Sequence, residues 1–194
     1  MYFGSYLKLF SALAAVASVA TAAPSGEVTL PASKDSTILR STTGCPSCPE
    51  NNCYKCTLGH EDTLEASSGA RALVRFLVGF ELTVPPSKIK NCTVLFPAFT
   101  KPLKAPVNVT ISHAKSSEWD EGTVSGESAP ESNVLFATIP VAANNNMGYI
   151  DITPACQGAD ADGKFSIDVG TESGSIAIWS KDSGNPAILH VRYA

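Results

Sequence analysis

The chain has 194 residues, 44% of them hydrophobic, and its 14 basic and 18 acidic residues give a formal net charge of −4. This length allows one domain with a substantial hydrophobic core. The acidic balance, with no basic cluster, argues against nucleic acid and anionic membrane surfaces as partners.

The first 22 residues are expected to be a signal peptide and not part of the fold. Lys8 precedes an almost wholly apolar run, 9–20, and Ala20 and Ala22 are the small residues that a signal peptidase requires. The apolar run is too short to span a bilayer as a retained anchor. We therefore expect an extracellular, secreted protein whose mature part, 23–194, is a single domain.

From Glu27 onward, short apolar alternations separated by Pro, Gly, Ser and Asn are typical of strands joined by turns. The sequence shows no sustained helical period, and we expect at most one helical turn, around 154–158. The close spacing of the strands predicts an all-β protein, a β-sandwich and not a βαβ fold. The expected strands are 27–30, 35–40, 71–78, 89–96, 106–113, 134–141, 148–153, 164–170, 175–181 and 187–193.

Six cysteines, an even number, lie in the mature chain: Cys45, Cys48, Cys53, Cys56, Cys92 and Cys156. The first four have the spacing CxxC-x4-CxxC, which in a cytosolic protein would indicate zinc. In an oxidising compartment the symmetric spacing favours a small hairpin closed by nested disulfides. The outer bridge would join Cys45 to Cys56, and the inner bridge would join Cys48 to Cys53. The two remaining cysteines would pair with each other and close a long loop.

The stretch RALVRF, residues 71–76, begins the expected strand 71–78. Its apolar residues share one face, which leaves Arg71 and Arg75 together on the other face. The two guanidinium groups must then face either water or a ligand. A half-buried strand with solvated arginines and a strand that presents them to an acidic ligand both remain open.

Two sequons fit a secretory route, because Asn91 and Asn108 each begin an Asn-X-Thr triplet. The apolar residues of strand 106–113 alternate with Asn108, which places that side chain on the wet face as a glycan requires. We therefore expect glycosylation at both asparagines.

The strand 175–181 carries an aromatic residue on its expected outer face. Ile176 and Ile178 should point inward, which turns Trp179 and Lys181 outward. A large exposed ring suits sugar binding, because the C–H face of a pyranose packs flat on an indole. The alternative is that a loop or the cysteine hairpin covers Trp179.

Four segments in chain order resemble one known family. They are RALVRF (71–76), WDEGTV (119–124) with the following AP (129–130), YIDIT (149–153), and SKD (180–182) with the following NPAIL (185–189). Together they are similar to the DNRLRE-type domain, also called carbohydrate-binding module family 96, over about residues 28–194. The resemblance implies a jelly-roll-like β-sandwich that binds polysaccharide, with acidic polymers such as alginate among the known ligands.

In the family, basic side chains bind the sugar carboxylates. The resemblance therefore gives this role to Arg71, Arg75 and Lys181. Trp179, which its strand position turns outward, would stack on a sugar ring. The chain departs from the family pattern in its inserted cysteine hairpin, 45–56, which would either cover or extend the binding face. It also lacks an attached catalytic domain, so we expect the protein to act alone, at a cell wall or matrix.

No catalytic constellation stands out in the sequence. The three histidines lie far apart, and there is neither an HExxH motif nor a GxSxG elbow. Acidic residues crowd the stretch 118–131, and a glycosidase uses two carboxylates, but a solvated acidic loop is the commoner meaning. No cofactor is expected; a structural calcium ion is left open, with Asp35, Asp151 or Asp160 as candidate ligands and none favoured.

We therefore expect a glycosylated, disulfide-bonded, monomeric β-sandwich that binds polysaccharide without cutting it. The alternative is a structural or adhesive protein of the cell wall or surface, with proteins as its partners.

Overall fold

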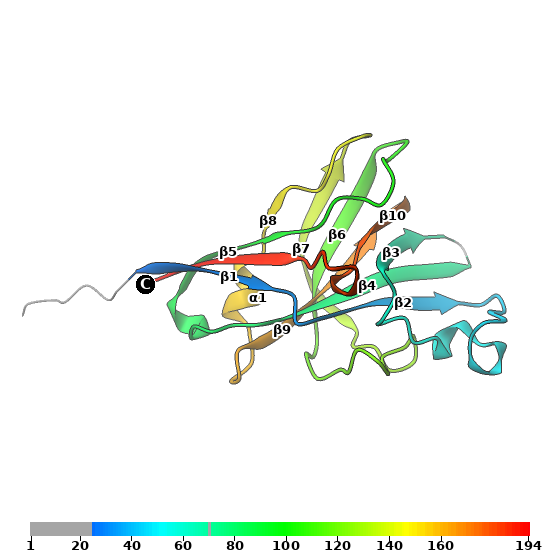
Figure 1. Cartoon of the computed structure of the whole chain (residues 1–194), viewed down its shortest axis with the longest axis horizontal. Helices are drawn as coiled ribbons and strands as arrows, with labels where there is room; N and C mark the ends of the chain where they lie inside the picture. The colour runs from blue at the N-terminus through cyan, green and yellow to red at the C-terminus, as the bar shows by residue number, and fades with distance from the viewer. Residues whose placement is uncertain (1–24, 70) are drawn as a thin grey trace, which may run out of the picture.

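The computed structural model of the protein describes residues 25–69 and 71–194, so the expected signal peptide, 1–22, lies outside the described residues. The described chain forms two antiparallel β-sheets that pack face to face (Figure 1). The expectation of an all-β sandwich is therefore confirmed. Among the described residues, no helix has the length and apolar character needed to cross a membrane.

The smaller sheet has four strands and contains the first and last strands of the fold. Its order is β1 (Gly26–Pro31), β11 (Ile188–Tyr193), β5 (Ile89–Leu95) and β8 (Tyr149–Asp151). Gly26 pairs with Tyr193, so β1 begins beside the C-terminus (Figure 1).

The larger sheet has seven strands. Its main path is β10 (Gly174–Trp179), β3 (Thr63–Ser68), β4 (Ala72–Glu81), β9 (Lys164–Thr171), β6 (Val107–Ala114) and β7 (Ser132–Val141). The seventh strand, β2 (Lys34–Ser41), also pairs with β4. The sequence did not predict β3, because its six residues, TLEASS, contain only two apolar side chains, Leu64 and Ala66.

Helical structure is confined to short turns. The α-helix α1 (Thr153–Gln157) follows β8, close to the turn that the sequence predicts. The 3-10 turns are η1 (Pro49–Asn51), η2 (Cys53–Lys55), η3 (Pro86–Lys88) and η4 (Lys181–Ser183).

The main core lies between the two sheets and follows from the two-residue period of the strands. Val107 and Ile111 of β6 point into the core as predicted, and Asn108 between them is exposed. Phe80 of β4 and Phe165 of β9 stack with their ring centroids 5.4 Å apart. Because each fully buried side chain of this size is worth about 1.5–3 kcal/mol, the interface between the sheets is the main source of stability.

A loop covers part of the outer face of the larger sheet. This covering loop, residues 115–131, places Trp119 and Val124 against Ile38 and Leu77, which form a second and smaller apolar cluster. β4 is therefore buried on both faces along its second half. In this half of β4 the alternating side chains face the main core on one side and the second apolar cluster on the other, so neither side faces solvent.

Basic side chains of β2 hold the covering loop by its backbone. Lys34 Nζ donates to the carbonyl oxygens of Ser117 and Trp119, both at 2.6 Å. Arg40 Nε donates to the carbonyl oxygen of Gly126 at 2.9 Å. These contacts satisfy carbonyl groups that the loop would otherwise bury without partners.

The six cysteines form three disulfides, and the nested pairing expected for the first four is wrong. The structure joins Cys45 to Cys53 and Cys48 to Cys56, so the two bridges cross. Two successive 3-10 turns replace the expected hairpin and bring cysteines eight residues apart to Cα separations of 5.0 Å. The third bridge joins the two remaining cysteines, as expected, and ties β5 to α1.

Candidate functional site

A groove runs along β10 and β3 at the edge of the larger sheet. The antiparallel register places Trp179 opposite Thr63 and Ala177 opposite Glu65. These side chains share the outer face of the two-stranded ribbon and line a groove of about 750 Å³. The six residues of β10 span about 20 Å, so the groove is long enough for an extended ligand.

Trp179 is the large exposed aromatic residue of this groove. Its side chain is 39% exposed, whereas Ile176 and Ile178 on the opposite face of β10 are buried in the core. The outward direction that the sequence predicts is confirmed, and neither a loop nor the disulfide-bonded segment buries the ring. The exposed indole offers the flat apolar surface on which a sugar ring packs.

One wall of the groove is the segment 100–107, which runs beside β10. Thr100 donates its backbone N–H to the carbonyl oxygen of Ala177 at 2.8 Å and so attaches the segment to the strand. This attachment brings Lys101 and Lys104, both exposed, to the groove. Neither lysine forms an ion pair with a residue that the structure describes, so both charges are available to a bound ligand.

Arg75 reaches neither the groove nor the solvent. Its side chain is 8% exposed; Nη1 lies 2.9 Å from Asp168 Oδ2, and Nη2 donates to the Pro130 carbonyl oxygen at 3.2 Å. Burial lowers the pKa of Arg75, and the Asp168 carboxylate opposes this shift. The expectation that this guanidinium faces water or a ligand is wrong, because the covering loop lies over the outer face of β4.

Lys181 is held by two acidic side chains. Its Nζ lies 2.9 Å from both Glu121 Oε2 and Asp182 Oδ1. Burial works to lower the pKa of Lys181, but hydrogen bonds to these carboxylates raise it above its ordinary value. Its backbone N–H donates to Asp35 Oδ2 at 2.8 Å. Burial raises the pKa of Asp35 to about 6, although the bond from Lys181 lowers it.

Arg71 is exposed in the turn between β3 and β4. Trp179 lies opposite Thr63, the first residue of β3, whereas Arg71 follows the end of that strand. The length of β3, about 17 Å, therefore separates Arg71 from Trp179. Arg71 does not line the groove. Of the four binding residues that the sequence suggests, the structure therefore places only Trp179 there.

The two sequons lie on different sheets. Asn108 is exposed at the start of β6, and its Nδ2 donates to Glu172 Oε2 at 2.8 Å. Asn91 is half-buried on β5, in a shallow recess that Tyr149 and His190 also line. Glycosylation of both remains a prediction.

The disulfide-bonded segment, 45–56, supports the covering loop and lies away from the groove. Glu127 of the loop donates its backbone N–H to the Tyr54 carbonyl oxygen at 3.0 Å. Gly126 approaches so closely that a Cβ there would lie 2.4 Å from the Leu39 carbonyl oxygen. None of the described residues that line the groove belongs to 45–56. The segment, which extends beyond β2 in Figure 1, therefore neither covers nor extends the groove.

Comparison with known proteins agrees with this architecture. The family model of carbohydrate-binding module family 96 matches residues 51–193, a range that includes both strands of the groove. An uncharacterized secreted protein of Arthroderma benhamiae is 56% identical over 195 residues, which cover 100% of this chain and 100% of that protein. The resemblance seen in the sequence is thus confirmed, and the chain belongs to carbohydrate-binding module family 96.

Proposed function

We propose that this protein is secreted and binds a polysaccharide of a cell wall or extracellular matrix in the β3–β10 groove, without catalysis. The observation that carries the proposal is Trp179, whose exposed ring lies along the groove. Family membership supports the class of ligand, and the secreted relative supports the compartment. The length of the groove suits a polymer better than a single sugar.

The charge of the groove favours an acidic polymer. Lys101 and Lys104 line one wall, and Glu65 on the floor is the acidic side chain that opposes them. Each ammonium group attracts a sugar carboxylate as a point charge, an interaction that salt screens. The two lysines take the role that the sequence suggests for other basic residues, while Trp179 stacks on a ring.

Trp179→Ala tests the aromatic contribution. Retention of the oxidised protein on insoluble polysaccharide should fall sharply, while the thermal midpoint changes little because the ring is at the surface. Tyr149→Ala is the matched control, since this side chain is 66% exposed on the smaller sheet, away from the groove. Unchanged retention of Trp179→Ala, or equal losses in both variants, would place binding elsewhere.

The double variant Lys101→Ala/Lys104→Ala tests the charge of the ligand. Retention of the wild type on uronic-acid polymers should weaken with added salt, and the double variant should lose most of this retention. Lys90→Ala, at an exposed position outside the groove, is the control. Salt-insensitive retention on neutral glucans would show that the two lysines do not bind the ligand. A failure to bind any polysaccharide would favour the structural or adhesive alternative.

A further inference from the structure

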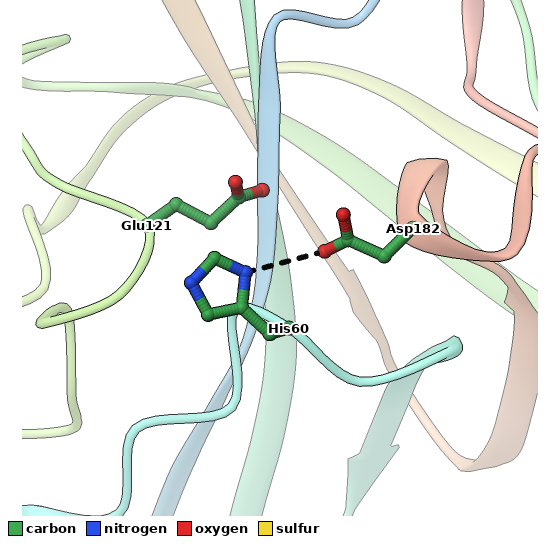
Figure 2. A group of neighbouring side chains, drawn as sticks. All are labelled: His60, Glu121 and Asp182. Atoms are coloured by element: carbon green, nitrogen blue, oxygen red, sulfur yellow. Dashed lines mark ion pairs between the residues drawn. The ribbon is translucent and has the colours of Figure 1, made fainter.

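Three metal-ligating side chains from distant parts of the chain meet outside the groove. His60 follows the disulfide-bonded segment, Glu121 belongs to the covering loop, and Asp182 lies in η4. One ligand atom from each lies within 4.8 Å of the other two. In Figure 2 the imidazole of His60 lies below the Glu121 carboxylate and points its Nδ1 toward Asp182 Oδ2, 3.5 Å away.

A glycine next to His60 permits this close approach. A Cβ on Gly59 would lie 1.9 Å from the backbone carbonyl oxygen of Glu121, so only glycine lets the two segments come so near. Gly122, on the other side of Glu121, lies beside the ring, and a Cβ there would be 3.3 Å from His60 Nε2. These two glycines therefore allow the imidazole and the Glu121 backbone to lie close together.

One oxygen of a buried carboxylate beside this cluster lacks a partner. Asp35 is 1% exposed, and its Oδ1 has no hydrogen bond to any residue in 25–69 or 71–194. Its backbone N–H donates to Glu121 Oε1 at 2.7 Å, and its Oδ2 accepts the bond from the Lys181 amide. These two contacts connect Asp35 to the cluster, through Glu121 on one side and through the residue next to Asp182 on the other. An unpaired oxygen of this kind is costly in a protein interior and calls for a positive partner.

The carboxylates at the cluster outnumber the ammonium group that contacts them. Asp35, Glu121 and Asp182 supply three carboxylates, and Lys181 supplies one ammonium group. An imidazole binds a metal ion in its neutral form and carboxylates bind it ionised, so three carboxylates and one ammonium group leave two negative charges, the charge that one divalent cation neutralises. Lys181 contacts Oε2 of Glu121 and Oδ1 of Asp182, so Oδ2 of Asp182, the oxygen nearest His60, is free of it.

We propose that His60, Glu121 and Asp182 bind one divalent transition-metal ion, of which zinc is the most suitable, and that Asp35 adds negative charge behind them. The imidazole decides the class of ion, because calcium takes oxygen ligands and six to eight of them, whereas zinc accepts nitrogen and carboxylate oxygen in a site of about four ligands. Three protein ligands leave a position for water.

The ion would tie together three segments that no disulfide connects. It would fix the covering loop to η4, which follows β10, and to the chain that leads from the cysteines into β3. The site is separate from the groove, since none of its three ligands lines the groove. Its test is therefore independent of sugar binding.

Calorimetric titration with zinc chloride tests the proposal on the secreted, oxidised protein after dialysis against a chelator. We expect saturable binding of one zinc ion and a thermal midpoint that rises with zinc, because the ion binds the native state. His60→Ala and Asp182→Asn should each weaken zinc binding by about 100-fold, since even partners outside the first ligand sphere are worth about 10- to 100-fold. Both positions are exposed, so these variants should fold.

His190→Ala, which removes an imidazole from the smaller sheet, is the matched control and should bind zinc as the wild type does. The proposal is overturned if the wild type shows no saturable zinc binding, or if His60→Ala binds zinc with unchanged affinity. Tighter binding of calcium than of zinc, with no dependence on His60, would overturn it as well. Loss of sugar retention in Trp179→Ala has no bearing on these outcomes.

Discussion

Arg75 of β4 and Asp168 of β9 form a buried ion pair within the larger sheet, beneath the covering loop, with 2.9 Å between Nη1 and Oδ2. Ser132 lies between them, because its Oγ accepts from Arg75 Nη1 at 2.6 Å and donates to Asp168 Oδ2 at 3.0 Å. Burial raises the pKa of Asp168, and the guanidinium opposes this shift. The arginine is therefore part of the interior of the protein.

Arg75→Met should destabilise the protein by about 3–5 kcal/mol, because it leaves the Asp168 carboxylate buried without its partner. The double variant Arg75→Met/Asp168→Leu should recover much of this loss, since no uncompensated charge remains. Denaturant unfolding measures both effects. A single variant of unchanged stability that no longer binds sugar would show instead that Arg75 contacts the ligand.

Trp119 anchors the covering loop through a buried hydrogen bond from its Nε1 to Ser166 Oγ, at 2.9 Å. Trp119→Phe removes the donor and should cost about 1–3 kcal/mol, because the hydroxyl group is left without it. A double-mutant cycle with Ser166→Ala should give a coupling energy of about 1 kcal/mol. Additive losses in the cycle would show that the bond contributes nothing to stability.

The disulfides should differ in what they contribute. In the chain-entropy model, the Cys92–Cys156 bridge, with a sequence separation of 64, is worth about 4 kcal/mol, whereas a bridge with a separation of 8 is worth about 2.5 kcal/mol. Replacement of Cys92 and Cys156 by alanine should therefore lower stability more than replacement of Cys45 and Cys53. Peptide mapping of the unreduced protein checks the crossed pairing directly, and a nested pairing would contradict the structure.

His113 should make the protein sensitive to mild acid. Its ring lies against Phe136, with centroids 5.8 Å apart, and burial lowers the pKa of His113 below its ordinary value of 6.5. The unfolded chain then takes up the proton at a higher pH than the native state, so stability falls as pH drops below about 6.5. His113→Gln should lose less stability than the wild type between about pH 7.5 and about pH 5. Equal losses in thermal melts at the two pH values would contradict this.

The alternation of apolar and polar residues predicted those features of the fold that depend only on neighbouring residues in the sequence. The inward series of β6 and the outward direction of Trp179 both follow from the two-residue period of a strand, and both agree with the structure. The four motifs, taken in their chain order, added the family resemblance. Most strands of the two sheets could therefore be predicted from the sequence, but β3 could not.

The surroundings of the basic residues could not be predicted, because they depend on segments far away in the chain. Arg75 alternates correctly with its apolar neighbours, but the covering loop, about 50 residues further on, lies over that face. Lys101 and Lys104 reach the groove only because Thr100 bonds to β10, more than 70 residues later. Nothing in KPLKAP itself indicates that contact, although its two prolines mark a restrained loop.

The way in which the covering loop is held has a consequence for evolution. Lys34, Arg40 and Arg75 all bind backbone carbonyl oxygens of the loop, which every residue type supplies. Selection for stability therefore acts on these three cations and on the path of the loop, and much less on its exposed side chains. Related proteins can then exchange exposed loop residues such as Glu118 and Glu127 and acquire different surface chemistry while the sheet beneath stays unchanged.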